Sequence, residues 1–266
     1  SGRLRPQSIA MKNPALIGFY TMVRKDIIRI FRIWSQTLLP PVITNVLYFT
    51  IFGTFIGSQL AQIGGHSYMA FIVPGLVMMT IITSAYMNTV STFYFAKFIK
   101  NIEELLVSPM PAWVIVSGFV AGGVVRSFLV GTLVIITSLF FTHLTIYNIF
   151  AVFGAALLTS FLFSFAGLLN GFFAKSFDAI SIIPTFVLTP LTYLGGVFYS
   201  VDALPPFFKT LSLFNPILYM VNAFRYGFLG FSDVPVGLCF AVLGVLTAIF
   251  FTITLMLFIR GAGFKS

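Results

Sequence analysis

Residues 33–96 read IWSQTLLPPVITNVLYFTIFGTFIGSQLAQIGGHSYMAFIVPGLVMMTIITSAYMNTVSTFYFA, and these 64 consecutive positions contain no Lys, Arg, Asp or Glu. A helix needs about 20 apolar residues to cross the hydrocarbon core of a bilayer, so this stretch is long enough for two crossings. Polar residues between Ser58 and Ser67 interrupt it near its middle. The sequence therefore predicts two membrane spans, near 36–57 and 68–93, joined by a turn.

A second uncharged stretch covers residues 127–174, a run of 48 positions. Polar positions within 142–148 divide it in the same way. Two further apolar segments follow, each bounded by Asp, Lys or Arg. The remaining spans are therefore predicted near 113–140, 149–173, 179–198 and 235–259.

The expected fold class is all-α integral membrane, with six transmembrane helices. We expect one transmembrane domain over 16–266, after an N-terminal tail over 1–15. Residues 1–10 are expected to be a remnant that precedes a native start at Met11.

The composition supports this class. Hydrophobic residues make up 59% of the chain and charged residues 8%, with a mean hydropathy of +1.04. A soluble domain usually has about 25% charged residues. Phe alone occurs 34 times, and lipid-facing helices can present such side chains to hydrocarbon. A water-soluble globule, a disordered chain and a nucleic-acid-binding protein are therefore excluded.

The positive charges are distributed unevenly. The chain has 15 Lys and Arg residues against 6 Asp and Glu residues, a formal net charge of +9. With six spans, 13 of the 15 fall on the side of the two termini, and only Lys209 and Arg225 fall on the other. Because cytoplasmic segments retain Lys and Arg, both termini are expected to be cytoplasmic. Topology and anionic lipid headgroups explain the basic excess, so no nucleic-acid partner is expected.

Residues 16–34 have apolar positions at the three- and four-residue spacing of one helical face. Lys25, Arg29 and Arg32 occupy another face. This pattern predicts an amphipathic helix in the cytoplasmic membrane interface. The alternative is a basic flank that only orients the first span.

Residues 97–109, between the second and third spans, form a shorter amphipathic segment that prolines terminate. Its two adjacent Glu residues do not face one another on a helix, so a catalytic pair is not expected. We expect a docking surface at the cytoplasmic tip of a helical hairpin, and a solvated turn is the alternative. The polar residues of this surface are Lys97, Lys100, Asn101, Glu103 and Glu104.

Residues 199–233, on the predicted external side, are too broken by proline to span and too apolar for an exposed loop. They fit two short helices that re-enter the membrane from outside, where protein or a water-lined cavity satisfies their ends. The alternative is an amphipathic lid on the outer leaflet. Arg225 is expected to lie at shallow depth and to pair with a carbonyl, a headgroup, Asp202 or Asp233. The other residues of this external cap are Pro205, Pro206, Asn215 and Pro216.

Three glycine pairs have the small-xxx-small spacing that lets membrane helices approach closely. They are Gly53 and Gly57, Gly118 and Gly122, and Gly167 and Gly171.

The sequence has no signal for chemistry of its own. No Gly-x-x-x-x-Gly-Lys-Ser/Thr motif occurs, so we do not expect this chain to hydrolyse ATP. His66 and His143 are too far apart for a zinc site, and no metal or catalytic residues are expected. No acidic residue falls at the centre of a predicted span, which argues against an ion-coupled carrier. An ion-coupled secondary transporter or channel, and a membrane enzyme acting on lipids, are the alternatives.

Several segments carry a resemblance to a known family. They are 101–109 (NIEELLVSP), 184–200 (PTFVLTPLTYLGGVFYS), 204–206 (LPP), 215–216 (NP) and 224–230 (FRYGFLG). Together with the basic amphipathic entry helix, they resemble permease subunits of ABC-2 type transporters. The resemblance is strongest to the YadH-like group of inner-membrane permeases, which is related to nodulation-factor and drug exporters.

The resemblance implies a permease that works as an exporter in the bacterial inner membrane. Two permease copies would pair with two copies of a separate ATP-binding-cassette ATPase. ATP and Mg²⁺ would be used by that partner, and no cofactor would be bound by this chain. Residues 97–106 would be the coupling helix, 16–34 the interface helix, and 204–214 with 216–228 the external re-entrant pair. Lipids, lipid-linked glycans and hydrophobic drugs all remain open as substrates.

Overall fold

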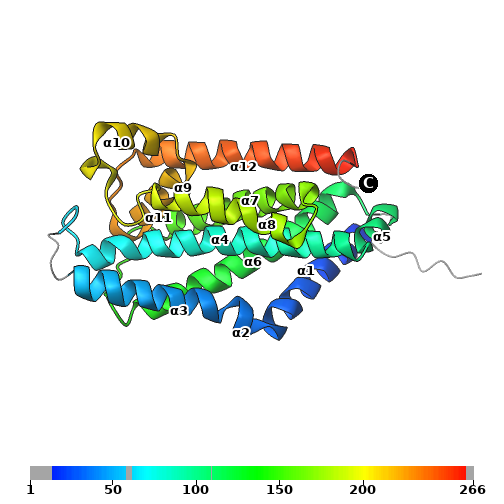
Figure 1. Cartoon of the computed structure of the whole chain (residues 1–266), viewed down its shortest axis with the longest axis horizontal. Helices are drawn as coiled ribbons and strands as arrows, with labels where there is room; N and C mark the ends of the chain where they lie inside the picture. Colours follow the sequence, from blue (N-terminus) through cyan, green and yellow to red (C-terminus); the bar gives the residue numbers. More distant parts are fainter. Residues whose placement is uncertain (1–13, 58–61, 109, 262–266) are drawn as a thin grey trace, which may run out of the picture.

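The computed structural model describes residues 14–57, 62–108 and 110–261, which are helical apart from connecting turns and one isolated bridge between Ile63 and His66. Most helices lie along one long axis (Figure 1). The amino-terminal half contains α1 (Pro14–Arg32), α2 (Trp34–Thr37), α3 (Leu39–Tyr48), the π-helix η1 (Phe49–Ile56), α4 (Tyr68–Phe98), α5 (Asn101–Val107) and α6 (Ala112–Ser138). The remainder contains α7 (Ile149–Phe173), α8 (Phe177–Ile183), the π-helix η2 (Pro184–Leu188), α9 (Thr189–Tyr193), the 3₁₀ turn η3 (Val201–Ala203), α10 (Pro206–Leu213), α11 (Pro216–Leu229) and α12 (Val236–Ile259).

Among the described residues, four helices are long and apolar enough to cross a membrane, namely α4, α6, α7 and α12. They confirm helices at the predicted spans near 68–93, 113–140, 149–173 and 235–259. Polar caps define where two of them start. The Ser67 side chain accepts a hydrogen bond from the Ala70 amide, and the Asn148 side chain accepts from Phe150 and Ala151.

The two other predicted spans are helical but interrupted. Residues 34–56 divide into α2, α3 and η1, with prolines in the first turn of α3. Residues 177–193 divide into α8, η2 and α9, with Pro184 opening η2 and Pro190 in the first turn of α9. Proline removes a backbone donor and disturbs the helical hydrogen-bond ladder. The helix predicted to reach residue 198 ends earlier, at Tyr193, before a turn in which Gly196 has a positive φ of 70°.

Contacts at the two ends of the molecule fix the helix directions. The Asn148 amide, at the start of α7, donates to the Gly227 carbonyl of α11 at 2.8 Å. At the other end the Lys97 ammonium of α4 donates to the Phe172 carbonyl of α7, also at 2.8 Å. The Phe258 ring, near the end of α12, lies 6.0 Å from the Phe172 ring. Helices α4, α7 and α12 therefore run from the α11 end to the α5 end, and α6 runs back (Figure 1).

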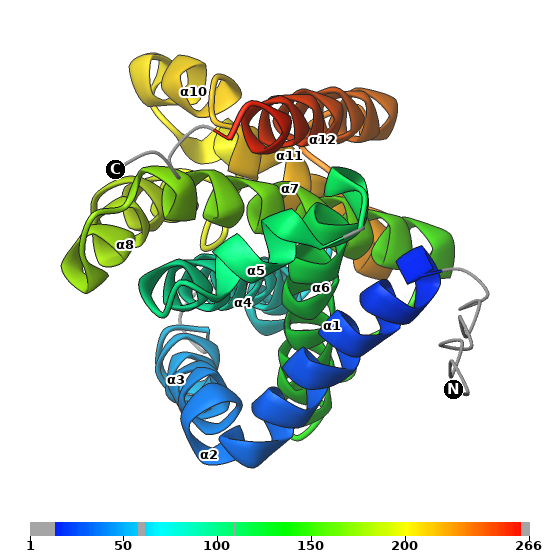
Figure 2. The ribbon, with the colours of Figure 1, turned by 90° about the vertical axis from the view of Figure 1, so that its right-hand side faces the viewer.

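Helix α4 lies at the centre of the bundle, packed against α6 and α7 (Figure 2). Gly167 lets α7 approach it closely, since an added Cβ would lie 2.6 Å from the Tyr86 carbonyl oxygen. Gly118 of α6 similarly faces Met22 of α1, with the sulfur 2.8 Å from an added Cβ. Helix α12, by contrast, is largely exposed and strongly apolar, as expected of a lipid-facing helix.

Candidate functional site

The short helix α5 lies across the end of α4 and α6 and faces the viewer in Figure 2. It begins after Lys100, whose φ of 59° turns the chain out of α4. Ile102 anchors α5, being buried in an apolar cluster that includes Phe93 and Phe119. Glu103 and Glu104 are exposed. The helix thus presents two carboxylates outward from a buried apolar anchor.

The other polar residues predicted for this surface have different surroundings. Lys97 belongs to the last turn of α4, and its ammonium binds the Phe172 and Ala174 carbonyls. Lys100 is exposed, and Asn101 is half-buried at the start of α5. Lys97 therefore joins α4 to the end of α7, and Lys100, Glu103 and Glu104 are the exposed charged residues of the predicted docking surface.

Helix α1 is an amphipathic helix that packs on α6. Lys25 and Arg32 are exposed, as predicted for its polar face. Arg29 instead points inward and donates to the side chains of Asn88, at 2.9 Å, and Thr92 on α4. The periodicity of the sequence predicted that all three basic residues lie on one face. Arg29 differs because its side chain binds polar residues of α4, which the spacing within one helix does not reveal.

A cavity of about 470 Å³ separates α1 from α5, with walls from α4 and α6. Lys25 and Arg29 line it from α1, and Asn101 and Glu104 line it from α5. The two amphipathic helices therefore face one another across a cavity that has charged side chains of both signs in its lining.

The segment predicted to be the external cap contains α10 and α11, which lie at the opposite end of the molecule from α5 (Figure 1). Arg225 of α11 is fully buried, and its guanidinium donates to the Gly196 carbonyl at 2.6 Å and to the Phe71 carbonyl at 3.3 Å. It also lies 3.7 Å from the Asp233 carboxylate and 3.8 Å from the centroid of the Phe71 ring. Asp202 pairs instead with Lys209, at 2.7 Å on the surface. Two of the partners predicted for Arg225, backbone carbonyls and Asp233, are therefore confirmed.

The other cap residues define the ends of the two short helices. Pro205 immediately precedes α10 and Pro206 is its first residue. The Asn215 side chain accepts from the Ile217 amide and donates to the Leu191 carbonyl at 2.6 Å, which joins α11 to α9. Pro216 is the first residue of α11, where its missing N–H costs nothing.

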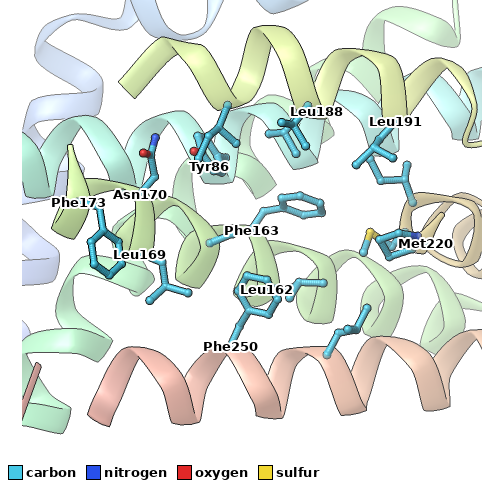
Figure 3. Close-up of a pocket in the computed structure, with 16 residues that line it drawn as sticks. Tyr86, Leu162, Phe163, Leu169, Asn170, Phe173, Leu188, Leu191, Met220 and Phe250 are labelled. Atoms are coloured by element: carbon cyan, nitrogen blue, oxygen red, sulfur yellow. The ribbon is translucent and has the colours of Figure 1, made fainter. Parts of the chain in front are cut away.

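An apolar cavity of about 410 Å³ lies between α4, α7, the α8–α9 segment, α11 and α12 (Figure 3). Phe163, Leu188, Met220 and Phe250 are among the side chains that line it. Sequence reasoning missed this cavity, because its lining comes from ordinary apolar positions of helices far apart in the chain. Within the described residues no cluster of three or more His, Cys, Asp or Glu could hold a metal ion.

The fold and the charged and apolar cavities together define the class of protein. The chain is a multi-pass helical membrane protein, with charged amphipathic helices at one end and a cavity among its apolar helices.

Comparison with known proteins gives the family. The ABC-2 type transporter family profile matches residues 18–229. The chain is 57% identical over 242 residues to the inner membrane transport permease YadH of Escherichia coli strain K12, covering 91% of this chain and 94% of that protein. Nodulation protein J of Neorhizobium galegae is 23% identical over 216 residues, covering 81% and 82%. The same protein of Rhizobium leguminosarum bv. trifolii is 26% identical over 208 residues, covering 76% and 79%. The chain belongs to the ABC-2 type transporter family and is a transport permease.

Proposed function

We propose that two copies of this permease form the translocation pathway of an exporter, driven by two copies of a separate ATP-binding-cassette ATPase. The observation that carries the proposal is the charged surface of α1 and α5, exposed on a chain of the ABC-2 family that has no phosphate-binding loop. The partner would bind ATP and Mg²⁺ and would push on α5 when it closes.

The anchoring of α5 supports this role. Ile102 is buried against the ends of α4 and α6, so a force on α5 would reach these two long helices through packed side chains. Lys97 fixes the end of α4 to the end of α7. Movement at the docking surface would therefore tilt several helices together and open a pathway toward the outside.

We also propose six crossings, with both termini in the cytoplasm of a bacterial inner membrane. Helix α7 ends at the α5 end and α12 begins at the α11 end, so the chain between them returns through α8, η2 and α9. Helix α1 lies at the α5 end and α4 begins at the α11 end, so the chain between them also passes from one end to the other. We therefore propose that α3 and η1 form the first crossing (Figure 1). The seventeen residues of Phe177–Tyr193 would be about 25 Å long as a helix, close to the thickness of the hydrocarbon core.

The positions of the charges weigh against an ion-coupled carrier. The four long apolar helices contain no Asp or Glu, and their only charged residues are Lys97 and Arg126. Carriers coupled to protons or sodium ions often place acidic residues near the middle of the membrane. The lack of such residues in these four helices favours the ABC exporter over an ion-coupled secondary transporter.

Co-purification tests the proposal directly. The tagged permease, purified from the membranes of its native host, should capture an ATP-binding-cassette subunit. The captured complex should hydrolyse MgATP. A permease that captures no ATPase, or that moves substrate without one, would contradict the proposal.

A further inference from the structure

A polar cavity of about 210 Å³ lies where α1, α2, α4 and α6 meet. Two arginines line it, Arg29 from α1 and Arg126 from α6. Gln36, Asn88 and Ser91 add amide and hydroxyl groups to the lining. Arg126 lies 14 residues after the start of α6, inside an otherwise uncharged helix. Neither the docking surface nor the apolar cavity of Figure 3 includes Arg126.

The two arginines are not balanced by negative charge. The structure describes all six acidic residues of the chain, and none lies within 4.0 Å of the Arg126 guanidinium. Arg29 has only Asp26, whose carboxylate is 3.8 Å from its Nε. Burial raises the pKa of Asp26, because desolvation outweighs the attraction of Arg29 and Lys25. Arg29 and Arg126 are close enough to repel one another.

Unpaired hydrogen-bond donors concentrate on the same residues. The Nε atoms of Arg29 and Arg126 and the Nδ2 atom of Asn88 are buried without a hydrogen-bond acceptor. The sole hydrogen bond of Arg126 to the described residues runs from Nη2 to the Thr37 carbonyl, at 3.5 Å. Unpaired donors beside two cations are the groups that an oxyanion satisfies.

Part of the cavity wall is open to the outside of the molecule. Ile33 and Gln36, which form part of its wall, are exposed. Thr37, whose carbonyl accepts from Arg126, lies near the start of the first proposed crossing, so the proposed topology puts this cavity toward the cytoplasmic side. Arginine recognises phosphate oxygens in two-pronged geometry, and the neighbouring apolar helix surfaces suit acyl chains.

We infer that this cavity binds the phosphate group of an anionic amphiphile that enters from the cytoplasmic leaflet, and that such amphiphiles are the cargo of this permease. The inference rests on the proposed export function, because a receiving site on the cytoplasmic side is useful only if transport is outward. Arg29 and Arg126 would hold the phosphate, and Asn88 and Gln36 would donate to its remaining oxygens.

The test measures lipid binding to the purified full-length permease in phosphatidylcholine nanodiscs. Short-chain phosphatidic acid should bind and raise the thermal unfolding midpoint, whereas inorganic phosphate and added phosphatidylcholine should not. Binding of inorganic phosphate with equal affinity would mean that the site takes the free anion, and it would overturn the amphiphile assignment. Arg126→Gln should weaken binding of phosphatidic acid about tenfold, since one charge-assisted contact is lost.

The control is Arg24→Gln, which removes one positive charge from an exposed position of α1 outside this cavity. It should bind phosphatidic acid as the wild type does, and equal weakening would mean that only the general surface charge attracts the lipid. Without lipid, Arg126→Gln should unfold at the same temperature as the wild type or above it, because charge repulsion is removed. A lower midpoint together with unchanged lipid binding would make Arg126 a structural residue and overturn the inference.

The complex with the ATPase separates this inference from the proposed function. Phosphatidic acid should stimulate ATP hydrolysis by the wild-type complex and not by the Arg126→Gln complex. Binding without stimulation would leave a structural lipid site and overturn the cargo assignment, although the exporter would stand. Failure of the permease to assemble with any ATPase would overturn the exporter itself, whatever the lipid result.

Discussion

Arg225 and Asp233 form a buried ion pair at the α11 end of the molecule, in the predicted cap, with both side chains almost completely shielded from solvent. The charge of Arg225 is offset by this one carboxylate, two carbonyls and the face of Phe71. Asp233 also accepts hydrogen bonds from the Ser200 hydroxyl and the Val201 amide. The pair therefore joins α11 and the segment after it to the loop that follows α9.

Asp233→Asn is expected to destabilise the protein by about 3–5 kcal/mol, because it leaves a buried guanidinium without its counter-charge. Asp202→Asn is the matched control, since Asp202 pairs with Lys209 on the surface, where such pairs contribute about 0–1 kcal/mol. Thermal unfolding of both variants in detergent checks the difference. Equal midpoints for the two variants would show that the buried pair does not stabilise the protein.

Gly167 should be intolerant of a side chain. An added Cβ would lie 2.6 Å from the Tyr86 carbonyl and 3.2 Å from the Val90 amide, both in the backbone of α4. Gly167→Leu is therefore expected to lower the free energy of unfolding by about 3 kcal/mol, the upper part of the range for overpacking. It should also lower the yield of folded permease.

Gly244→Leu on α12 is the control for this substitution, because an added Cβ there meets no atom within 4 Å. Size-exclusion profiles and unfolding midpoints would compare the two variants. A Gly167→Leu protein as stable as the control would mean that α4 and α7 do not need this close contact.

At the scale of single elements, α5 is the part whose role is easiest to isolate. Glu103→Lys and Glu104→Lys reverse exposed charges without touching the buried Ile102. Each should lower ATP-driven transport, or lipid-stimulated ATP hydrolysis, about tenfold or more, because a charge reversal at a docking face disfavours association. Membrane insertion should stay normal. Asp202→Lys, the same reversal on the opposite face, should have no effect, and unchanged coupling in all three variants would remove α5 from the docking surface.

Uninterrupted helices could be predicted from the sequence more accurately than helices that contain prolines. The span predicted at 149–173 coincides with α7. Its limits could be predicted because Asn148 caps its start and its sequence is free of charge. The stretch 179–198 was predicted as one helix, and its break into α8, η2 and α9 depends on how Pro184 and Pro190 are accommodated. The amphipathic character of α1 was predicted from spacing, but the inward turn of Arg29 requires Asn88 and Thr92 of another helix.

The sites were harder to predict than the spans. Glu103 and Glu104 were predicted to belong to a docking surface because a polar face is visible in one short segment, and their role stays a prediction. The cavity lined by Arg29 and Arg126 brings together residues about 100 positions apart. From the sequence, Arg126 was predicted only to be one of the basic residues on the cytoplasmic side. Pairing of distant side chains depends on helix packing, which periodicity in a single sequence does not specify.

At the scale of the whole molecule, the proposed topology places Lys175 and Lys209 on opposite sides of the membrane, because α8, η2 and α9 lie between them. Both side chains are exposed. In a Cys239→Ser background, which removes the one native thiol, a cysteine at 209 should react with an impermeant maleimide in intact spheroplasts. A cysteine at 175 should react only after permeabilisation. Labelling of both cysteines from the same side would show that α8, η2 and α9 do not cross the membrane, and it would contradict the proposed six crossings.

The central claim is that this permease works as a pair driven by a pair of ATPases, and native mass spectrometry of the purified complex tests it most directly. The permease and the ATP-binding subunit that it captures should be released together from nanodiscs as one assembly. The account predicts a mass equal to two 29.4 kDa permeases plus two ATPase subunits. A permease that appears only as a single chain or as a pair without ATPase, under conditions in which it transports substrate, would contradict it.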